Sequence, residues 1–213
     1  MGAYEYDFPF VITQQPVSGS FYVGDSLTLA VVARGGVPPL SYRWRLNGSD
    51  ISGATSTDLA LGPLALVDAG PYDCAVTDSG ISNVTSDPAA LAVADHLQIG
   101  TQPRRMELHE GAPYTLFVET AGGYLPLAYQ WSKDGTDILD ATASSYEIAS
   151  FAESNAGTYT LHIHDSLTDA ADSIPAELFL AISGMPIAGV AGLAAAALAA
   201  GLLGALRLRR RTK

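Results

Sequence analysis

The chain repeats itself at one fixed spacing of 87 residues, and no gap is needed to keep the register. Trp44 recurs as Trp131, and the pair Gly35-Gly36 recurs as Gly122-Gly123. Seven further positions follow the same shift: Pro16 and Pro103, Gly24 and Gly111, Tyr42 and Tyr129, Gly48 and Gly135, Gly70 and Gly157, Tyr72 and Tyr159, and Pro88 and Pro175. A period of this length is too long for a helical solenoid repeat and suits a small independent domain. The sequence therefore predicts a tandem duplication, with an N-terminal extension at 1–9 and domains at 10–94 and 97–183.

Short runs with alternating side chains lie between turn signals in both copies. Residues 27–33, 42–46 and 72–76 show this period of two, which is typical of half-buried antiparallel strands. Gly-Gly, Pro-Pro, Asn-Gly and Ser-Gly pairs separate such runs, and no stretch of about 12 residues in this part of the chain has helical periodicity. The pattern predicts an all-β fold class, with one β-sandwich in each copy.

A family resemblance rests on the segment Asp68-Ala69-Gly70-Pro71-Tyr72-Asp73-Cys74, which matches the D-x-G-x-Y-x-C motif of immunoglobulin domains. Gly24-x-x-Leu27-x-Leu29, the turn at 36–39 and Trp44 precede it in the family's order. Both copies resemble the I-set branch, which implies seven or eight strands per domain and tyrosine corners at Tyr72 and Tyr159. The resemblance also implies a structural core signature, formed by Trp44, Tyr72, Cys74, Trp131, Tyr159 and Leu161.

The chain departs from the family at the disulfide that joins strands B and F. Val31 stands at the strand B position opposite Cys74, and the second copy has Val118 and Leu161 there. Cys74 is the single cysteine, so an intramolecular disulfide is excluded. Because the loss of such a bond typically costs about 2–5 kcal/mol, we expect aliphatic packing around the tryptophans to compensate. Cys74 itself is expected to be buried and inert rather than reactive.

The connection between the copies, residues 93–97, passes almost directly from the last strand of one domain to the first strand of the next. A linker this short predicts a rod with limited bending.

Residues 187–206 form a stretch of 20 positions without a charged or polar side chain. A helix of that length spans about 30 Å, the thickness of a bilayer core, so we expect one C-terminal transmembrane α-helix. The basic tail at 207–213 would then be cytoplasmic and the two domains extracytoplasmic, at the cell membrane and cell surface. The membrane-stop residues are Arg207, Arg209, Arg210 and Arg211.

Small residues recur at every fourth position of this segment, namely at Ala188, Gly192, Ala196, Ala200 and Gly204. Such a stripe can bring two helices together as a homodimer. The segment holds nine alanines and four glycines, so composition alone can also produce the stripe.

A Pro/Gly-containing motif (Gly184, Met185 and Pro186), a weakly apolar helix and a terminal arginine cluster follow one another. This order resembles the C-terminal sorting tails of bacterial surface proteins of the PEP-CTERM type, although the motif is not that family's Pro-Glu-Pro. The resemblance implies cleavage near the motif, and a retained helix is the alternative. Residues 1–7 do not look like a signal peptide, so we expect either a longer protein or an upstream start.

Charge and motifs exclude two functional classes. All 22 acidic residues but only six basic ones precede Gly184, so this part carries a net charge of −16. Such an acidic surface repels phosphates, and nucleic-acid binding is not expected. The sequence contains no nucleophile elbow, phosphate-binding glycine loop or His-Glu-x-x-His motif, so we expect a protein without catalytic residues or cofactors.

The weak candidates for a metal site are His162 and His164, which are two positions apart on one predicted strand face beside Asp165. The alternative is an ordinary solvated strand face. Two groups of turn carboxylates are further candidates, for calcium, although the spacing of a dedicated calcium loop is missing: Asp134, Asp137 and Asp140, and Asp165, Asp169 and Asp172. Asn47 and Asn83 begin N-glycosylation motifs, and the former is better explained by a turn.

Two functions remain open for such a module. The first is a stalk or spacer at the cell surface, which the acidity and the low aromatic content favour. The second is an adhesion or ligand-binding module that recognises a protein or glycan through loops or a sheet face, and it predicts an exposed aromatic or apolar patch. The candidates for that patch, some of which must be core, are Tyr4, Tyr6, Phe8, Phe21, Tyr22 and Tyr124.

Overall fold

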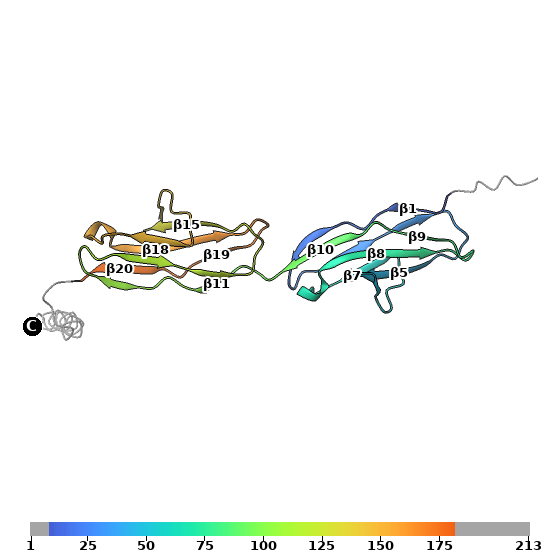
Figure 1. The fold of residues 1–213 in the computed structure, drawn as a ribbon, viewed down its shortest axis with the longest axis horizontal. Helices are drawn as coiled ribbons and strands as arrows, with labels where there is room; N and C mark the ends of the chain where they lie inside the picture. Colours follow the sequence, from blue (N-terminus) through green and yellow to red (C-terminus); the bar gives the residue numbers. More distant parts are fainter. Residues whose placement is uncertain (1–8, 182–213) are drawn as a thin grey trace, which may run out of the picture.

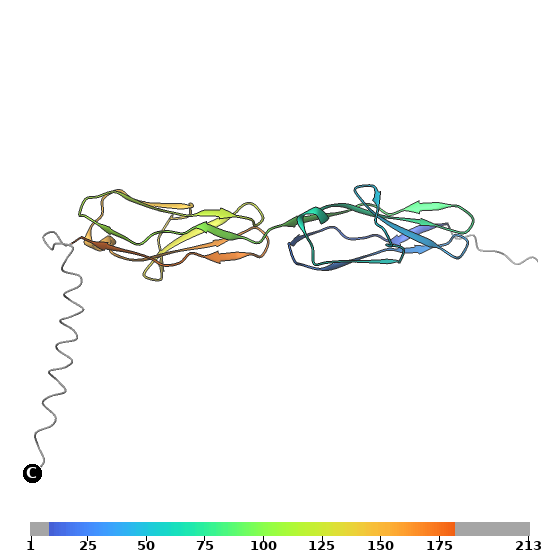
Figure 2. The same cartoon turned by 90° about the horizontal axis from the view of Figure 1, so that it is seen from below.

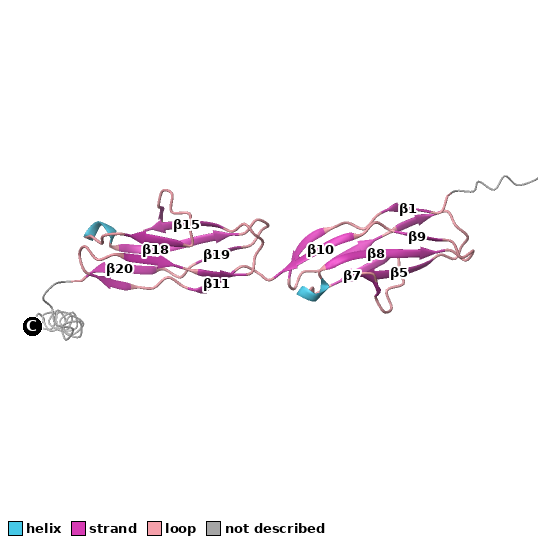
Figure 3. Cartoon of the chain, in the orientation of Figure 1, coloured by secondary structure: helices cyan, strands magenta, loops and turns pink. Residues whose placement is uncertain are grey.

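The computed structural model describes residues 9–181, which fold into two β-sandwiches placed end to end (Figure 1). A view turned by 90° shows the same elongated arrangement, in which the two domains meet at their ends (Figure 2). Besides strands, the described part contains two single-turn 3₁₀ helices, η1 (Leu66–Asp68) and η2 (Glu153–Asn155) (Figure 3). The prediction of two tandem all-β sandwiches is confirmed.

The transmembrane helix at 187–206, the motif at 184–186, the arginines at 207–211 and the N-terminal extension up to residue 8 lie outside the described residues. The expectations for these segments stay predictions. Among residues 9–181, no helix has the length and apolar character that crossing a bilayer requires.

The first domain holds β1 to β10. Its larger sheet has the strand order β2-β10-β8-β5-β6, with β9 paired to β8, and two strand pairs, β1-β4 and β3-β7, complete the sandwich. The bounds are β1 (Val11–Gln14), β2 (Gly19–Tyr22), β3 (Leu27–Ala30), β4 (Val32–Arg34), β5 (Ser41–Leu46), β6 (Ser49–Asp50), β7 (Asp58–Leu61), β8 (Gly70–Thr77), β9 (Asn83–Thr85) and β10 (Ala89–Ala94).

The second domain repeats this topology with β11 to β20. Its larger sheet runs β12-β20-β18-β15-β16, with β19 paired to β18, and β11-β14 and β13-β17 form the remaining pairs. The bounds are β11 (Gln98–Thr101), β12 (Met106–Leu108), β13 (Tyr114–Phe117), β14 (Glu119–Ala121), β15 (Ala128–Lys133), β16 (Thr136–Asp137), β17 (Ser145–Ile148), β18 (Gly157–His164), β19 (Ala170–Asp172) and β20 (Ala176–Leu180).

Each described domain contains ten strand segments instead of the seven or eight that the resemblance implied. Two breaks explain much of the difference. Proline has no N–H to donate to a ladder, and the buried Pro16 lies where the chain stops pairing with β4 and goes on to pair with β10. Val31 separates β3, which pairs with β7, from β4, which pairs with β1. Pro103 and Val118 occupy the same places in the second domain.

Each core is built around one tryptophan that has no exposed surface, Trp44 or Trp131. Their indole N–H groups donate to the carbonyl oxygens of Ser56 at 2.9 Å and Ala143 at 3.0 Å, so neither buried donor is left unpaired. The two cores share no buried residue, and therefore each domain is stabilised by its own packing. All six signature residues are at most 1% exposed.

Aliphatic packing stands where the family has its disulfide. Cys74 lies opposite Trp44 in the β5-β8 register, and Leu161 lies opposite Trp131 in the β15-β18 register. Val31 is 1% exposed and Val118 5%, so valine fills the facing positions. Cys74 is a free, fully buried thiol, and its burial raises its pKa. The thiol therefore stays protonated at neutral pH, as an inert cysteine requires.

The corner tyrosines and the hairpin turns follow the sequence prediction. The hydroxyl of Tyr72 donates to the carbonyl oxygen of Asp68 at 2.9 Å, and that of Tyr159 to Asn155 at 2.8 Å. Asn47 has φ 52° and Gly48 has φ 76°, so this pair forms the turn between β5 and β6 with the positive angles that tight hairpins need.

Candidate functional site: the interdomain joint

A largely buried polar network lies between the two domains, and we call it the joint. Strand β10 ends at Ala94 and β11 begins at Gln98, so only residues 95–97 connect the sandwiches. The amide of Gly123 donates to the carbonyl oxygen of Asp95 at 2.9 Å, and the amide of Leu97 donates to Oδ2 of Asp169 at 2.8 Å. The connection is therefore held against the second domain at both of its ends.

The repeated glycine pair makes room for this connection. Gly122 has φ +71°, and a Cβ added there would overlap the carbonyl oxygen of His96. Gly123 has φ +73°, and its added Cβ would come within 3.2 Å of the Asp165 Cβ. A side chain at position 122 would push the linker away, so glycine is needed there for a close approach as well as for its backbone angle.

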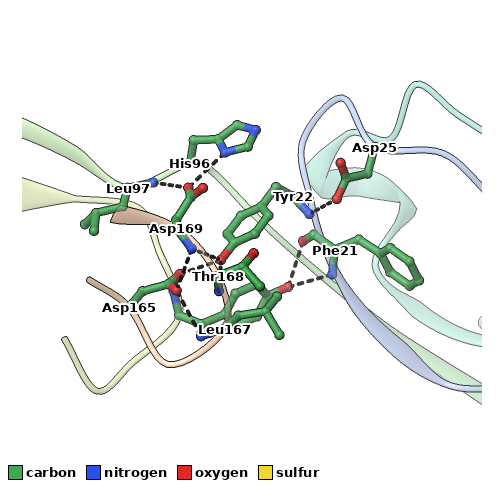
Figure 4. Close-up of polar contacts among 10 residues, drawn as sticks. Phe21, Tyr22, Asp25, His96, Leu97, Asp165, Leu167, Thr168 and Asp169 are labelled. Carbon is green, nitrogen blue, oxygen red and sulfur yellow. Dashed lines mark hydrogen bonds and ion pairs between the residues drawn. The ribbon is translucent and has the colours of Figure 1, made fainter. Parts of the chain in front are cut away.

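Tyr22, at the end of β2, inserts its hydroxyl into a turn of the second domain (Figure 4). The side chain is buried, with 5% of its surface exposed. Its hydroxyl donates to Oδ2 of Asp165 at 2.7 Å and accepts from the amides of Thr168 at 3.2 Å and Asp169 at 3.1 Å. The Tyr22 amide in turn donates to Oδ2 of Asp25 at 2.8 Å, which fixes the strand end that carries the ring.

A second tyrosine makes the reciprocal contact. Tyr124 belongs to the second domain, and its hydroxyl donates to the carbonyl oxygen of Phe21 at 2.8 Å and accepts from the Phe21 amide at 3.3 Å. Each domain therefore places one phenol on the other domain. Two separated hydrogen-bonded points resist both bending and twisting more strongly than a single point would.

Aromatic packing fills the space between these points. The ring of Tyr22 stacks on His96 with 4.8 Å between centroids, and it meets Tyr124 edge-on at 5.5 Å. The Nδ1 atom of His96 lies 2.8 Å from Oδ2 of Asp169, in the loop that also receives the Tyr22 hydroxyl. The linker residue thus takes part in the joint, and its orientation is set from two sides.

Asp165 is the polar centre of the joint and is 4% exposed. Burial opposes its ionisation, but hydrogen bonds from the Tyr124 amide, the Tyr22 hydroxyl and the amides of Leu167 and Asp169 outweigh that effect. Together they lower the pKa of Asp165 to about 2. The carboxylate is therefore ionised at neutral pH, when it can accept all four bonds (Figure 4).

This geometry corrects the prediction of an aromatic binding patch for two candidates. Tyr22 is buried and Tyr124 is hydrogen-bonded across the joint, so both rings serve contact between the domains. The backbone of Phe21 receives Tyr124, while its ring packs against the first core. Tyr4, Tyr6 and Phe8 lie outside the described residues.

The candidate metal ligands His162 and His164 do not gather into a ligand cluster, and His162 pairs instead with a surface carboxylate. His162 contacts Oδ1 of Asp172 through Nδ1 at 2.6 Å, and its ring centroid lies 6.3 Å from that of His164. The neighbouring Asp165 is engaged with Tyr22. Residues 9–181 contain no group of three or more His, Cys, Asp or Glu side chains that could hold a metal ion.

Four of the six turn carboxylates considered for calcium have other partners, and one of them, Asp172, pairs with His162. Asp134 accepts the Thr158 amide at 2.8 Å and lies 3.2 Å from the Lys133 ammonium. The backbone hydrogen bond from Thr158, followed by that from Lys133, lowers the pKa of Asp134. Asp165 and Asp169 belong to the joint. These carboxylates hold turns and loops in place.

The joint itself was not found from the sequence, although a signal for it was present. Asp78 and Asp165 are separated by the same 87 residues as the core positions. By contrast, Tyr22 corresponds to His109, and Tyr124 corresponds to Val37. The chain has one joint, so a side chain that contacts the other domain there need not occur in both copies. Positions where the 87-residue repeat fails, such as Tyr22 and Tyr124, were therefore the signal for the joint.

Comparison with known proteins places this fold. No family model matches the chain. It is 40% identical over 68 residues to the decoration protein of Escherichia phage T5, over 32% of this chain and 42% of that protein. It is 28% identical over 185 residues to the mucosa-associated lymphoid tissue lymphoma translocation protein 1 homolog of Mus musculus, over 78% of this chain and 22% of that protein. The chain thus spans less than half the length of these curated relatives.

Solved structures with the same fold include the I-band fragment I67-I69 from titin and the immunoglobulin domains 1–5 of Sidekick-1. The TM-scores are 0.61 and 0.65, each at 18% sequence identity and over 81% of this chain, and cover 66% and 39% of those chains. The chain therefore has the fold of two tandem immunoglobulin-like domains.

Proposed function

We propose that this module is a membrane-anchored stalk or spacer at the cell surface. It would hold an attached domain at a fixed distance from the membrane and in a fixed direction. The joint is the observation that supports this function most. Three residues connect β10 to β11, and one tyrosine hydroxyl from each domain, that of Tyr22 or Tyr124, forms hydrogen bonds to the other domain. These contacts keep the two sandwiches in line (Figure 1).

The strength of the joint can be estimated from its hydrogen bonds. A hydrogen bond between neutral groups contributes about 0.5–1.5 kcal/mol, and one to a charged group about 1.5–3 kcal/mol. The Tyr22 bond to Asp165 and the Tyr124 bond to Phe21 together thus favour the straight state by on the order of 2–4 kcal/mol. Since about 1.4 kcal/mol is a factor of ten, bent states would make up a few per cent or less of the population.

The remaining parts of this proposal come from charge and sequence. The acidic body opposes self-association and nonspecific attachment. The apolar segment 187–206 would anchor the module in the bilayer, with the arginines at 207–211 on the cytoplasmic side. The homodimer through the small-residue stripe and the cleavage near 184–186 belong to this proposal as details of the anchor.

Distance measurements between the domains test the stalk. Ser49→Cys and Thr136→Cys place two spin labels at equivalent exposed positions on β6 and β16, while the native Cys74 is buried. Double electron–electron resonance should give one narrow distance distribution. A broad distance distribution in the protein that carries only the two label substitutions would contradict a stalk of fixed direction.

The anchor has a separate test. Cells that express the chain are fractionated, and the domains should remain with the membrane and be digested by protease added from outside. Mass spectrometry of the mature protein then decides between loss of residues 187–213 and a retained helix. Recovery of the intact chain in the aqueous fraction would contradict anchoring.

The second candidate is an attachment module for a protein or glycan. The similarity to a phage decoration protein favours it, as does an apolar hollow of about 670 Å³ on the second domain. The hollow is lined by Thr120, Leu125, Pro126, Leu127 and Tyr129. Leu125 is 80% exposed there, and Pro126 and Leu127 extend the apolar surface that a partner could cover.

A matched pair of variants tests attachment. Leu125→Ser alters the hollow, whereas Leu139→Ser changes a leucine that is 88% exposed elsewhere on the same domain. Binding to a glycan array and to isolated cell envelopes should fall with Leu125→Ser and not with Leu139→Ser. Equal binding by both variants would leave the stalk as the better function.

A further inference from the structure

The end of the first domain that lies away from the joint is built like the end of the second domain that receives Tyr22. We call it the outer end, and it consists of the loop at 35–37 and the turn at 78–82. Oδ2 of Asp78 accepts the Val37 amide at 2.9 Å, as Oδ2 of Asp165 accepts the Tyr124 amide at 2.7 Å. Asp78 is 7% exposed, so its carboxylate is buried like that of Asp165.

The hydrogen bonds around the two carboxylates also correspond. The Ser79 hydroxyl donates to the carbonyl oxygens of Val37 at 3.0 Å and Pro38 at 2.9 Å. The Ser166 hydroxyl makes the same two bonds in the second domain, to the residues that follow its glycine pair. The Asp78 amide donates to Ser82 at 3.0 Å, as the Asp165 amide donates to Asp169 at 2.9 Å. The loop at 35–37 and the first residues of the turn therefore match the receiving end. The turn differs at Ile81, which has φ 67° and donates its amide to the Asp78 carbonyl oxygen at 3.1 Å, whereas the Thr168 amide donates to the Tyr22 hydroxyl.

Two donors distinguish the two carboxylates. Oδ1 of Asp165 accepts the amides of Leu167 and Asp169, whereas within the described residues Oδ1 of Asp78 accepts the Ser82 amide. Oδ2 of Asp165 accepts the Tyr124 amide and the Tyr22 hydroxyl, whereas from residues 9–181 Oδ2 of Asp78 accepts the Val37 amide. A carboxylate oxygen can accept about two hydrogen bonds, so this buried oxygen retains capacity for another donor. Val37 is 56% exposed and Ile81 is 90% exposed, and these two side chains give the outer end an apolar surface.

We propose that the outer end is a docking socket for another immunoglobulin-like domain that carries a tyrosine at the end of its second strand. The ring would lie against the apolar surface of the outer end, and its hydroxyl would donate to Asp78 as Tyr22 donates to Asp165. A second copy of this chain offers His109 at the Tyr22 position of its second domain, and Tyr22 itself is occupied in the joint. A tyrosine-bearing partner therefore fits the socket better than a second copy.

An extended chain tests the socket with a known partner. A copy of residues 9–95 is inserted between Phe8 and Pro9 of the full chain, so that the new joint keeps the 87-residue spacing and presents a free Tyr22 to Asp78. Amide hydrogen exchange at Val37 is compared with that of the unmodified chain. Docking should slow this exchange about tenfold, the equivalent of one hydrogen bond.

Two substitutions in the inserted copy make the result specific. Tyr22→Phe removes the incoming hydroxyl, whose partners in the native joint all lie in the other domain, so folding of the copy is spared. It should restore the faster exchange. Tyr42→Phe makes the same chemical change on β5 of the copy, at the opposite end of that domain from Tyr22, and should leave the slower exchange unchanged. Val37→Tyr in the receiving domain should slow exchange further at Gly36, because it adds the counterpart of Tyr124.

Three results would overturn the proposal. The first is exchange at Val37 that does not change when the copy is inserted, or that responds equally to Tyr22→Phe and Tyr42→Phe. The second is faster exchange at Val37 in the unmodified chain after Tyr4→Phe combined with Tyr6→Phe, which would identify the chain's own N-terminal segment as the occupant. The third is concentration-dependent dimerisation that His109→Ala abolishes, which would identify a second copy.

Discussion

Removal of one oxygen atom from the joint, by Tyr22→Phe, should loosen the two domains without unfolding either. The phenylalanine ring keeps the stacking on His96, at 4.8 Å between centroids, and the edge-on contact with Tyr124. Only the hydrogen bonds of the hydroxyl are lost. They join the first domain to Asp165, Thr168 and Asp169 in one turn of the second.

The size of the effect follows from those three partners. The Asp169 amide keeps a second acceptor, Oδ1 of Asp165 at 3.1 Å, so it is not left unpaired. The Thr168 amide and Oδ2 of Asp165 lose the hydroxyl. A hydrogen bond from a neutral donor to a charged acceptor contributes about 1.5–3 kcal/mol, so the bent population should rise between about tenfold and a hundredfold. From a few per cent or less, bent states would become a substantial fraction.

Double electron–electron resonance between labels at 49 and 136 measures this population directly. The narrow distribution should broaden and gain shorter distances in Tyr22→Phe. Tyr42→Phe is the matched control, since the described residues make no hydrogen bond to that hydroxyl. If Tyr22→Phe leaves the width unchanged, or if Tyr42→Phe broadens it equally, the joint does not hold the domains in line in the way proposed.

Three further predictions test separate features of the structure. The pKa of Asp165 is lowered from 3.8 to about 2, so its contribution to the joint is complete above about pH 4 and is lost as the pH falls towards 2. The distribution of interdomain distances should broaden in this window, and Asp165→Asn should remove that pH dependence. Gly122→Ala should disturb the joint more than Gly111→Ala, because both glycines have positive φ but only the former would place its Cβ on the linker; interdomain distances for the two variants separate the clash from the backbone strain. Cys74 should react with a thiol reagent only as fast as the first domain unfolds, which labelling rates at increasing urea concentrations would show, and rapid labelling without urea would refute its burial.

The repeat and the core could be predicted from the sequence because packing imposes the same demand on both copies. Trp44 and Trp131 need the same cavity, and the corner tyrosines need the same backbone acceptor, so their positions repeat without a gap. The alternation of side chains placed the long strands correctly. It could not show that Pro16 and Val31 divide the outer strands, because those breaks depend on which neighbour each segment pairs with.

The site was harder to predict, since its residues come from segments far apart in sequence. Tyr22 and Asp165 are 143 residues apart and have no motif in common. An aromatic residue at a strand end is compatible with a core, a ligand site or a domain contact, and the sequence offers no preference among them. Only the path of the three linker residues brings the end of β2 against the turn after β18, and that path is a property of the folded domains.

The separation of the two cores from the joint has a consequence for interpreting variants of this chain. Since the cores share no buried residue, a core substitution such as one at Trp131 lowers the stability of its own domain and leaves the direction of the other unchanged. A substitution in the joint changes the relative direction of the domains and leaves the stability of each domain unchanged. The reason is that Tyr22 and Tyr124 form hydrogen bonds between the domains, whereas Tyr72 and Tyr159 form theirs within one domain. Stability and shape are therefore controlled by different residues, and a stalk that loses its function without losing its melting temperature should carry its change at the joint.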